Sequence, residues 1–419
     1  MAEIKPFKGV RYTEKAGNLQ ELISPLFDVV SNKEIEQLFR LPYNSIHLSF
    51  PQTSGSENVV DTWIQNGILR VDTTPAIYVY AQTFTLPDTN ETFTRTGFIC
   101  NLRLYDWQQG VVLKHESTMD FSVEDRVEVL EKTALHSSPV HLLYSDPDFV
   151  LKNNIEDALK SPISESIDSQ GTINRLAIIE DPGIIEKFVT TLSHKNLILA
   201  DGHHRYTAGL QFLSKQKVKD KGYSPDKPYN FIMAYLTNIE SEAIKILPTH
   251  RVIKNIPEFE EKSFVDKIKY YFQIQKLKDP YEVSKLLKNS KKHAFGLIMK
   301  NEVFLIELKP GLEKTIHWSF PEVVKNLDLT VLHYFIIEKV LNIKGKDQKN
   351  SRNIEFSAIF TKCIREITEG LAQLAVITRD IEMDEVKKVC FSGHTFPQKS
   401  TYFYPKVTSG LVFSSITHS

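Results

Sequence analysis

This 419-residue sequence has few cysteines and almost no net charge. Its three cysteines, Cys100, Cys363 and Cys390, are odd in number and widely spaced. They give neither a disulfide framework nor a CxxC metal pair, so we expect a reducing, cytoplasmic setting. The 51 lysines and arginines are balanced by 52 aspartates and glutamates, which leaves a formal net charge of −1. Because nucleic-acid-binding proteins usually carry a marked basic excess, this balance argues against a nucleic-acid partner.

Long apolar runs and the common catalytic signatures are also missing. The longest apolar runs, at 197–200 and 231–236, are far shorter than the roughly 20 residues of a membrane-spanning helix, so no membrane association is expected. The first ten residues lack the apolar stretch of a signal peptide. No P-loop, GxGxxG or GxSxG motif occurs, which removes the commonest nucleotide, dinucleotide and α/β-hydrolase signatures.

Strand-like and helix-like segments are interspersed along the chain, as in a mixed α+β protein. Residues 76–84 and 97–104 are rich in β-branched and aromatic residues and predict two paired strands, with the polar segment 89–95 as their loop. A short apolar strand at 195–200 leads towards a helix. A second helix is expected at 328–341.

At about 100–200 residues per domain, the length predicts two or three domains. We expect an N-terminal β-rich region over 1–110 and a mixed core over 111–256. A C-terminal α+β region over 257–419 begins where the composition becomes rich in lysine and glutamate. It ends in an unusual tail around 397–405 that is dense in hydroxyl and aromatic residues.

The strongest local motif lies where the predicted strand at 195–200 meets the following helix. It reads Asp201, Gly202, His203, His204, Arg205. Free backbone N–H groups and the helix dipole favour an anion at a helix start, and glycine lets the backbone approach it closely. Aspartate is a good N-cap type, and the three cationic or donating side chains suit phosphate oxygens. The motif therefore predicts phosphate binding, against the alternative of a capped helix with surface histidines.

A second candidate, His115-Glu116, follows another apolar strand. A carboxylate at a strand end can act as general base towards an alcohol, with the histidine as a neighbouring acid or phosphate donor. The alternative is a solvated surface pair.

Three further groups are weaker candidates. His250 and Arg251 again place an imidazole and a guanidinium after an apolar strand. In the tail, a lysine and two hydroxyl residues are possible substrate contacts if the tail folds over a ligand: Lys399, Ser400, Thr401. Arg11 and Asp28 are weaker substrate contacts, with surface or turn positions as the alternative.

The histidines and acids also raise the alternative of a metal hydrolase. Four histidines and two carboxylates would be enough ligands. However, no HxxxH or HExxH spacing exists, and the adjacent His203 and His204 would point in different directions on a helix. We therefore assign no metal site.

At these motifs the chain resembles the family called domain of unknown function 1015, whose members are often labelled SpoOJ/ParA/ParB/RepB-like. The resemblance runs from the opening 6–12 through 75–80, 115–118 and 201–206 to 397–405. The Asp-Gly-His-His-Arg motif is similar to that of ParB-like and sulfiredoxin-like folds, including the nucleotide-dependent free-serine kinase. The resemblance implies a ParB/sulfiredoxin-like mixed core, flanked by the N-terminal β-rich region and the C-terminal α+β region.

The same resemblance implies roles for the motif residues. Glu116 matches the general base of the kinase. The phosphate-binding residues of the kinase are matched by His203, His204 and Arg205. Lys114 stands where ParB-like chains usually have proline, and the longer flanking regions put the substrate in doubt.

Our leading hypothesis is phosphotransfer on a small hydroxyl metabolite, serine or phosphoserine, with the phosphate held at 202–205. The implied cofactors are a nucleotide, ATP or ADP, and Mg²⁺, which usually accompanies nucleotide phosphates. Two alternatives remain open: a phosphoserine-type phosphatase that uses the same site, and a non-catalytic nucleotide-binding regulator.

Overall fold

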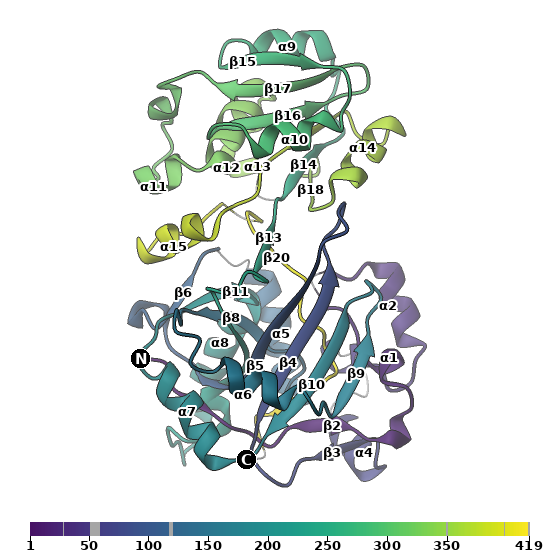
Figure 1. Ribbon diagram of the computed structural model, residues 1–419, viewed down its shortest axis with the longest axis vertical. Coiled ribbons are helices and arrows are strands. Elements are labelled where there is room, and N and C mark those ends of the chain that lie inside the picture. Colours follow the sequence, from purple (N-terminus) through teal and green to yellow (C-terminus); the bar gives the residue numbers. More distant parts are fainter. Residues whose placement is uncertain (28, 51–58, 117–119, 349–350, 398, 418–419) are drawn as a thin grey trace.

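The chain folds into two lobes that are stacked along the long axis of the molecule (Figure 1). The computed structural model describes residues 1–419 except 28, 51–58, 117–119, 349–350, 398 and 418–419. A nine-stranded mixed sheet forms the lower lobe and a six-stranded sheet the upper one, which confirms the predicted α+β class. Both chain termini lie on the lower lobe.

The lower sheet combines strands from both sides of residue 110. Its strands, in order, are β6 (Val112–Lys114), β11 (Leu197–Asp201), β8 (Val140–Tyr144), β12 (Phe231–Asn238), β5 (Thr92–Arg103), β4 (Ile77–Thr85), β10 (Ile173–Ile179) and β9 (Ser164–Ile167), with β1 (Ile4–Lys5) on β5. Most neighbours are antiparallel, but β6 runs parallel to β11, and β8 runs parallel to β12. The carboxyl ends of β6 and β11 therefore lie at the same edge of the sheet.

The β4–β5 hairpin has a shorter loop than the sequence predicts. Polar residues 92–95 were expected in the loop, but they continue β5 and pair with β4. Phe93 is aromatic, and Thr92 and Thr94 have β-branched side chains that suit a strand despite their polarity. Their hydroxyls bond across the hairpin, as between Thr83 and Thr94 at 2.9 Å.

Alternating residues of β4 belong to two different hydrophobic cores, one on each face of the lower sheet. Ile77 and Val79 of β4 join a core packed against helices on one face. Tyr78 and Tyr80 join a core closed by the N-terminal segment and by Val407, Leu411 and Val412 of the tail. This period-two alternation is what a strand covered on both sides requires.

Helices and short strands surround the lower sheet. The helices are α1 (Leu19–Leu22), α2 (Asn32–Phe39), α3 (Ile46–Ser49), α4 (Val59–Gln65), α5 (Asp120–Thr133), α6 (Lys152–Ala158), α7 (Pro182–Leu192) and α8 (His203–Lys219). The short strands pair as β2 (Val10–Tyr12) with β3 (Leu69–Val71), and β7 (Leu135–His136) with β21 (Ser414–Ser415). Among the described residues, no helix is both long and apolar enough to cross a membrane.

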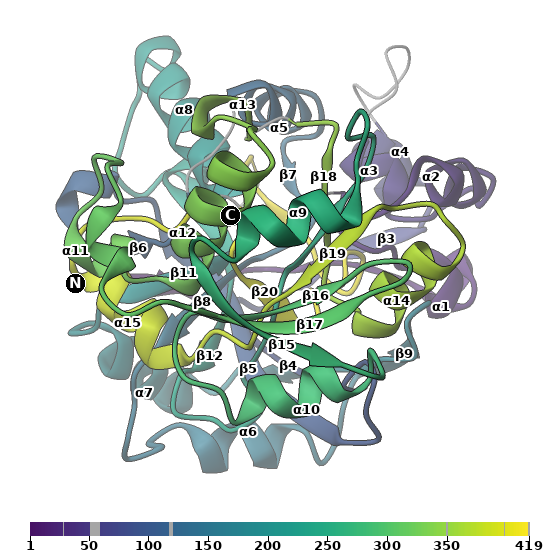
Figure 2. The ribbon, with the colours of Figure 1, turned by 90° about the horizontal axis from the view of Figure 1, so that it is seen from above.

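The upper sheet lies between two layers of helices (Figure 2). Its strands, in order, are β15 (Phe272–Leu277), β17 (Val303–Leu308), β16 (Ala294–Ile298), β19 (Leu374–Ile377), β14 (His250–Ile253) and β18 (Ile354–Ser357). One face packs on α9 (Glu261–Ile268) and a π-helix (Leu332–Val340), and the other on α10 (Glu282–Lys288) and α14 (Phe360–Thr368). The helix predicted at 328–341 thus begins as α12 (Asp328–Val331) and continues as that π-helix. Two short helices complete the lobe: α11 (Glu322–Lys325) and α13 (Gly345–Gln348).

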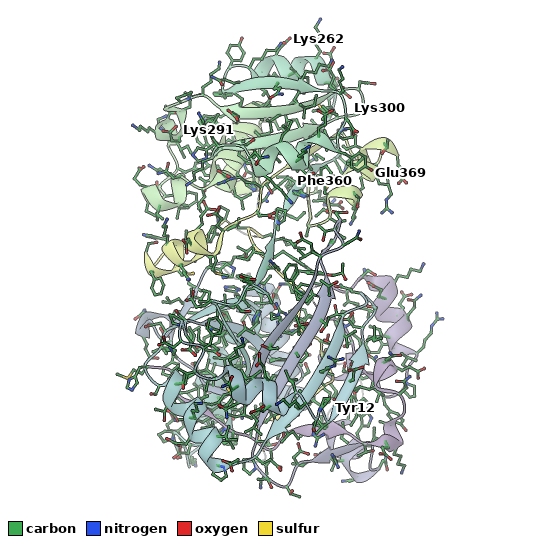
Figure 3. The ribbon with its side chains drawn as sticks, in the orientation of Figure 1. Tyr12, Lys262, Lys291, Lys300, Phe360 and Glu369 are labelled. Atoms are coloured by element: carbon green, nitrogen blue, oxygen red, sulfur yellow. The ribbon has the colours of Figure 1, made fainter. Side chains whose placement is uncertain are left out.

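The C-terminal tail returns from the upper lobe to the lower one (Figure 1). After α15 (Met383–Phe391), it forms β20 (Tyr402–Tyr404), which pairs with β13 (Lys245–Leu247) between the lobes. The lobes also meet at the β4–β5 hairpin, where Asp88 accepts a hydrogen bond from the Phe360 N–H (2.8 Å) at the start of α14. Phe360 is labelled in Figure 3, where the upper lobe faces the hairpin. Both contacts help to join the two lobes.

Candidate functional site

Two strand ends of the lower sheet bring the two strongest sequence motifs together. Because β6 and β11 are parallel neighbours, with Lys114 opposite Leu199, the residues that follow them lie side by side. His115 and Glu116 follow β6, and Gly202 follows β11. The rings of His115 and His203 meet edge to face, with 4.6 Å between their centroids.

Gly202 is the N-cap of α8. It adopts a left-handed conformation (φ 93°) and offers no side-chain acceptor to the helix. The Tyr206 N–H donates to the Gly202 carbonyl (2.9 Å), so the N–H groups of 203–205 have no acceptor within the helix. We expected Asp201 as the N-cap, and this is wrong: Asp201 ends β11, and its carboxylate binds cationic side chains instead. The N–H groups of the first turn of α8 therefore lie outside the hydrogen-bond ladder of the helix.

Replacing Gly202 with alanine should disrupt this turn. A Cβ there would lie 2.9 Å from Val140 Cγ1 and 3.1 Å from Arg205 Nη2, in addition to the strain of positive φ. Gly311 has a similar φ (87°) but no neighbour within 4 Å, so Gly311→Ala isolates the strain. We expect urea unfolding to show a loss of about 1 kcal/mol for Gly311→Ala and about 2–4 kcal/mol for Gly202→Ala. Equal losses would contradict the close packing of this turn.

A buried charge cluster anchors the start of α8. The Asp201 carboxylate accepts from Arg205 Nη2 (2.7 Å) and from the Lys406 ammonium. Burial alone would raise the pKa of Asp201, but Lys406 and Arg205 outweigh it and hold the pKa below its usual value. Arg205 also donates to the Pro139 carbonyl (2.6 Å) and the Ser138 hydroxyl (3.0 Å). Asp201 is thus ionised, and its two cations are fixed on either side of it.

The tail orients Glu116. One carboxylate oxygen, Oε1, accepts from the backbone N–H groups of Ser400 (3.0 Å) and Thr401 (3.2 Å). Within the described part of the chain, no residue bonds the other oxygen, Oε2. Glu116 lines the cleft described below, with its side chain 19% exposed. A carboxylate held by one oxygen leaves the other for a ligand.

His115 links β11 to the tail. Its Nδ1 is 2.7 Å from the Leu199 carbonyl and must donate to it, while Nε2 is 2.6 Å from the Thr401 hydroxyl. Burial lowers the pKa of His115, so the ring is neutral and Nε2 accepts from Thr401. His115 therefore positions Thr401 and, through its backbone, Glu116.

The two histidines of α8 differ in their surroundings. His203 is buried, burial places its pKa well below the usual value, and its Nε2 has no hydrogen-bond partner among the described residues. A buried polar atom of this kind is normally met by water or by a ligand. His204 is partly exposed and lines the cleft. The pair thus presents one neutral and one more accessible imidazole.

These groups line a single cleft of about 920 Å³ between the lobes. The lower lobe contributes the residues of the two strand ends, and the upper lobe contributes Phe356, Ser357, Ala358, Ile359 and Lys362. The tail adds a third wall: Lys399, Thr401, Tyr402, Tyr404 and Lys406. Cationic side chains therefore reach the cleft from all three sides.

Four other predicted site residues do not line the cleft. Arg11 forms a bidentate pair with Asp72, at 2.6 and 2.8 Å. Ser400 is buried, and its hydroxyl donates to the Pro397 carbonyl. The remaining two lie in the upper sheet: His250 and Arg251.

His250 and Arg251 turn into the upper lobe. His250 Nδ1 accepts the Thr378 N–H (3.2 Å), and Arg251 donates to His333 (3.1 Å) and to the Thr249 hydroxyl (2.7 Å). Asp28, the last predicted substrate contact, lies outside the described residues.

Sequence reasoning missed the contact between Lys406 and Asp201, and it missed the upper-lobe wall of the cleft. Lys406 belongs to a segment rich in hydroxyls and aromatics, but 205 residues separate it from Asp201, and no spacing reveals that contact. Phe356 and Lys362 lie on ordinary amphipathic elements. Only the folded arrangement of the lobes shows that they face the cleft.

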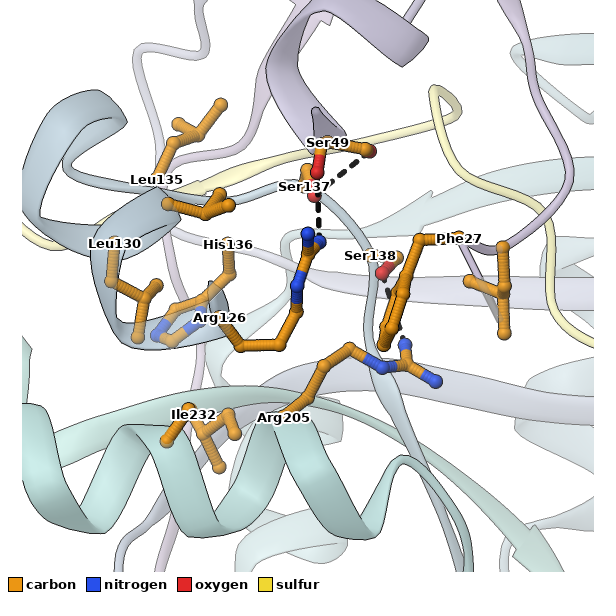
Figure 4. A pocket seen from close by; sticks show the side chains of 13 residues that line it. Phe27, Ser49, Arg126, Leu130, Leu135, His136, Ser137, Ser138, Arg205 and Ile232 are labelled. Atoms are coloured by element: carbon orange, nitrogen blue, oxygen red, sulfur yellow. Dashed lines mark hydrogen bonds between the residues drawn. The ribbon is translucent and has the colours of Figure 1, made fainter. Parts of the chain in front are cut away.

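A second, much smaller cavity lies behind Arg205 (Figure 4). Its free space of about 30 Å³ has room for one or two water molecules. Arg205 and Phe27 line both cavities. The second guanidinium there, that of Arg126, stacks on Phe27 at 4.1 Å and donates to the Ser49 carbonyl at 2.7 Å. A free space of about 30 Å³ is too small for a metabolite.

Metal ligands do not gather in the part of the chain that the structure describes. No group of three or more histidine, cysteine, aspartate or glutamate side chains there is arranged to hold a metal ion. The acids that line the cleft are Asp201, which is paired with two cations, and Glu116.

The fold and the cleft define a two-lobed α+β protein with a cleft at the start of a helix. The chain belongs to the family described as "Protein of unknown function (DUF1015)", whose model matches residues 4–330. No curated protein matches the sequence.

Solved structures share the fold only distantly. A conserved hypothetical protein from Pyrococcus furiosus is 16% identical, with a TM-score of 0.35 over 72% of this chain and 92% of that one. A free serine kinase in complex with AMP is 17% identical, with a TM-score of 0.33 over 72% and 89%. SbnI with a C-terminal truncation, from Staphylococcus aureus, is 10% identical, with a TM-score of 0.36 over 74% and 85%.

Proposed function

We propose that this protein transfers a phosphoryl group from a nucleotide, ATP or ADP, to the hydroxyl of a small metabolite, with serine as the first candidate. The observation that carries the proposal is the start of α8 lying beside Glu116 in the cleft. The N–H groups and the dipole at a helix start, together with Lys406 and Lys399, suit a phosphate. A carboxylate beside them suits the deprotonation of an alcohol.

The size of the cleft supports a nucleotide as one of the ligands. Sites for drug-sized ligands usually measure about 300–1,000 Å³, and this cleft of about 920 Å³ lies at the upper end of that range. Serine or phosphoserine alone would leave most of it empty. Apolar side chains such as Phe356 and Ile359 line the part that belongs to the upper lobe, as a nucleoside would require.

In the proposed reaction, the hydroxyl oxygen of the acceptor attacks the terminal phosphorus of the nucleotide. A new P–O bond forms, and the bond from that phosphorus to the bridging oxygen breaks, so the shortened nucleotide leaves with the electron pair. Glu116 takes the hydroxyl proton on Oε2. The α8 N–H groups and Lys406 stabilise the charge on the transferred group, and such stabilisation and positioning supply most of the catalysis of phosphoryl transfer.

Mg²⁺ fits this site only as a companion of the nucleotide. Mg²⁺ is usually held by one or two carboxylates and by substrate phosphates. Because Asp201 is paired with Lys406 and Arg205, Glu116 is the remaining carboxylate among the described cleft residues. The metal would neutralise phosphate charge. The ParB/sulfiredoxin plan of residues 111–256 and a cytoplasmic setting are further parts of this proposal.

The proposal is tested by incubating the purified protein with serine, Mg²⁺ and either ATP or ADP, and by following phosphoserine with mass spectrometry. We expect nucleotide-dependent phosphoserine formation. His204→Ala should weaken nucleotide binding about tenfold, the usual loss for one hydrogen bond to a charged group. The matched control is His194→Ala, an exposed histidine after α7, which should leave binding unchanged.

Other outcomes would assign the site differently. Release of phosphate from phosphoserine without any nucleotide would show that the protein is a phosphatase and not a kinase. Saturable nucleotide binding that raises the melting temperature, with no turnover of any hydroxyl metabolite, would replace it with a nucleotide-binding regulator.

A further inference from the structure

A second buried arginine of the lower lobe lies outside the groups described so far. Arg95 on β5 is fully buried, and no carboxylate pairs with it within the described residues. Its guanidinium lies 5.7 Å from the Tyr235 ring. A buried arginine without a carboxylate is costly, and an apolar side chain of similar volume would pack there more favourably. Folding stability alone therefore does not explain why an arginine occupies this position.

The hydrogen bonds of Arg95 go to the tail. Arg95 donates to the Pro405 carbonyl (2.6 Å), to the Tyr404 carbonyl (3.4 Å) and to the Gln82 side chain. Gln82 lies opposite Arg95 on β4, is also fully buried, and donates to the Lys406 carbonyl (3.0 Å). Two side chains of one hairpin thus bind three consecutive carbonyls of the tail.

The third of these carbonyls belongs to the lysine of the site. Lys406 extends its ammonium to Asp201 beside the first turn of α8, and its side chain lines the cleft. A lysine side chain has four rotatable methylene groups, so the position of its ammonium depends on a fixed backbone. Here Gln82 and Arg95 fix that backbone on the carbonyl side.

We propose that Arg95 and Gln82 are positioning residues that hold the tail so that Lys406 reaches both Asp201 and the anionic group of the ligand. The inference rests on the proposed phosphate site at the start of α8, but not on turnover. Neither residue lines the cleft, so any effect on a ligand must pass through the tail. The tail is then a functional wall of the site.

The test measures the binding of inorganic pyrophosphate to the full chain by isothermal titration calorimetry. Lys406→Met should weaken binding about 10- to 100-fold, as for the loss of a contact to a charged group. Arg95→Lys and Gln82→Leu should each weaken it about tenfold. In the Lys406→Met background, either change should add less than about twofold, because both act through the same ammonium.

Gln348→Leu is the matched control for Gln82→Leu. Gln348 is a buried glutamine of the upper lobe that also donates to backbone carbonyls, those of Ile343 (2.7 Å) and His333 (3.2 Å). It should lower the melting temperature about as much as Gln82→Leu and leave pyrophosphate affinity unchanged. If Arg95→Lys fails to fold, Gln82→Leu alone still completes the double-mutant cycle.

Three results would overturn the inference. They are losses of affinity that remain equal in the Lys406→Met background, an unchanged affinity in both hairpin variants, and a wild-type protein that does not bind pyrophosphate. Absence of serine phosphorylation with normal pyrophosphate binding would reject the proposed function and leave the inference standing.

Discussion

Glu116→Gln should lower kcat for phosphoserine formation about 100- to 10,000-fold, the usual contribution of a general base. Glutamine keeps the shape of the side chain, and its amide oxygen still accepts the N–H groups of Ser400 and Thr401. The amide nitrogen that replaces Oε2 cannot take a proton. Because the tail and the phosphate-binding turn remain in place, the nucleotide dissociation constant should change less than about threefold.

Steady-state kinetics and nucleotide titration of the same preparation separate these effects. The matched control is Glu165→Gln, which removes an exposed carboxylate on β9 that is paired with Arg175 at 2.5 Å. This control should keep full activity. A Glu116→Gln enzyme with undiminished kcat would remove Glu116 from the chemistry, and a joint loss of kcat and nucleotide affinity would make it a structural anchor of the tail.

The local parts of this site were predictable because each follows a strand. An apolar run that ends in Asp201-Gly202 and another that ends in His115-Glu116 both indicate strand ends, where loops carry functional side chains. Their contact depends on the parallel pairing of β6 and β11, which a single sequence does not reveal. The same limit hides the contact between Asp201 and Lys406, since it joins elements 205 residues apart.

Chemical type alone does not tell which cationic residues line the cleft. Arg205 lines the cleft, with its guanidinium bound to Asp201 and to the Pro139 carbonyl. Arg251, in the same sequence context of a strand and a hydroxyl, binds His333 and Thr249 inside the upper lobe. Whether a cationic side chain lines the cleft or is buried elsewhere is a property of the fold rather than of the local sequence.

Buried histidines should make the protein unstable in acid. Burial lowers the pKa of His136 to about 4, and burial together with Arg251 lowers that of His250 to about 4, from an ordinary 6.5. Between these values the unfolded chain binds protons that the folded chain does not, so the free energy of unfolding falls as the pH decreases. At about 1.4 kcal/mol per pH unit, each histidine accounts for about 3 kcal/mol, and both together for about 6 kcal/mol of a typical folding stability of about 5–15 kcal/mol.

Urea unfolding between pH 8 and pH 4 measures this loss, which should be complete near pH 4 and absent above about pH 7. His136→Gln keeps a donor for the Phe231 carbonyl, which His136 Nε2 bonds at 3.2 Å. His250→Asn keeps an acceptor for the Thr378 N–H. The double variant removes both titrations with the hydrogen bonds retained, so its stability should fall by about 6 kcal/mol less across this range. An unchanged pH dependence in the double variant would show that the acid lability arises elsewhere, in the carboxylates or the other buried histidines.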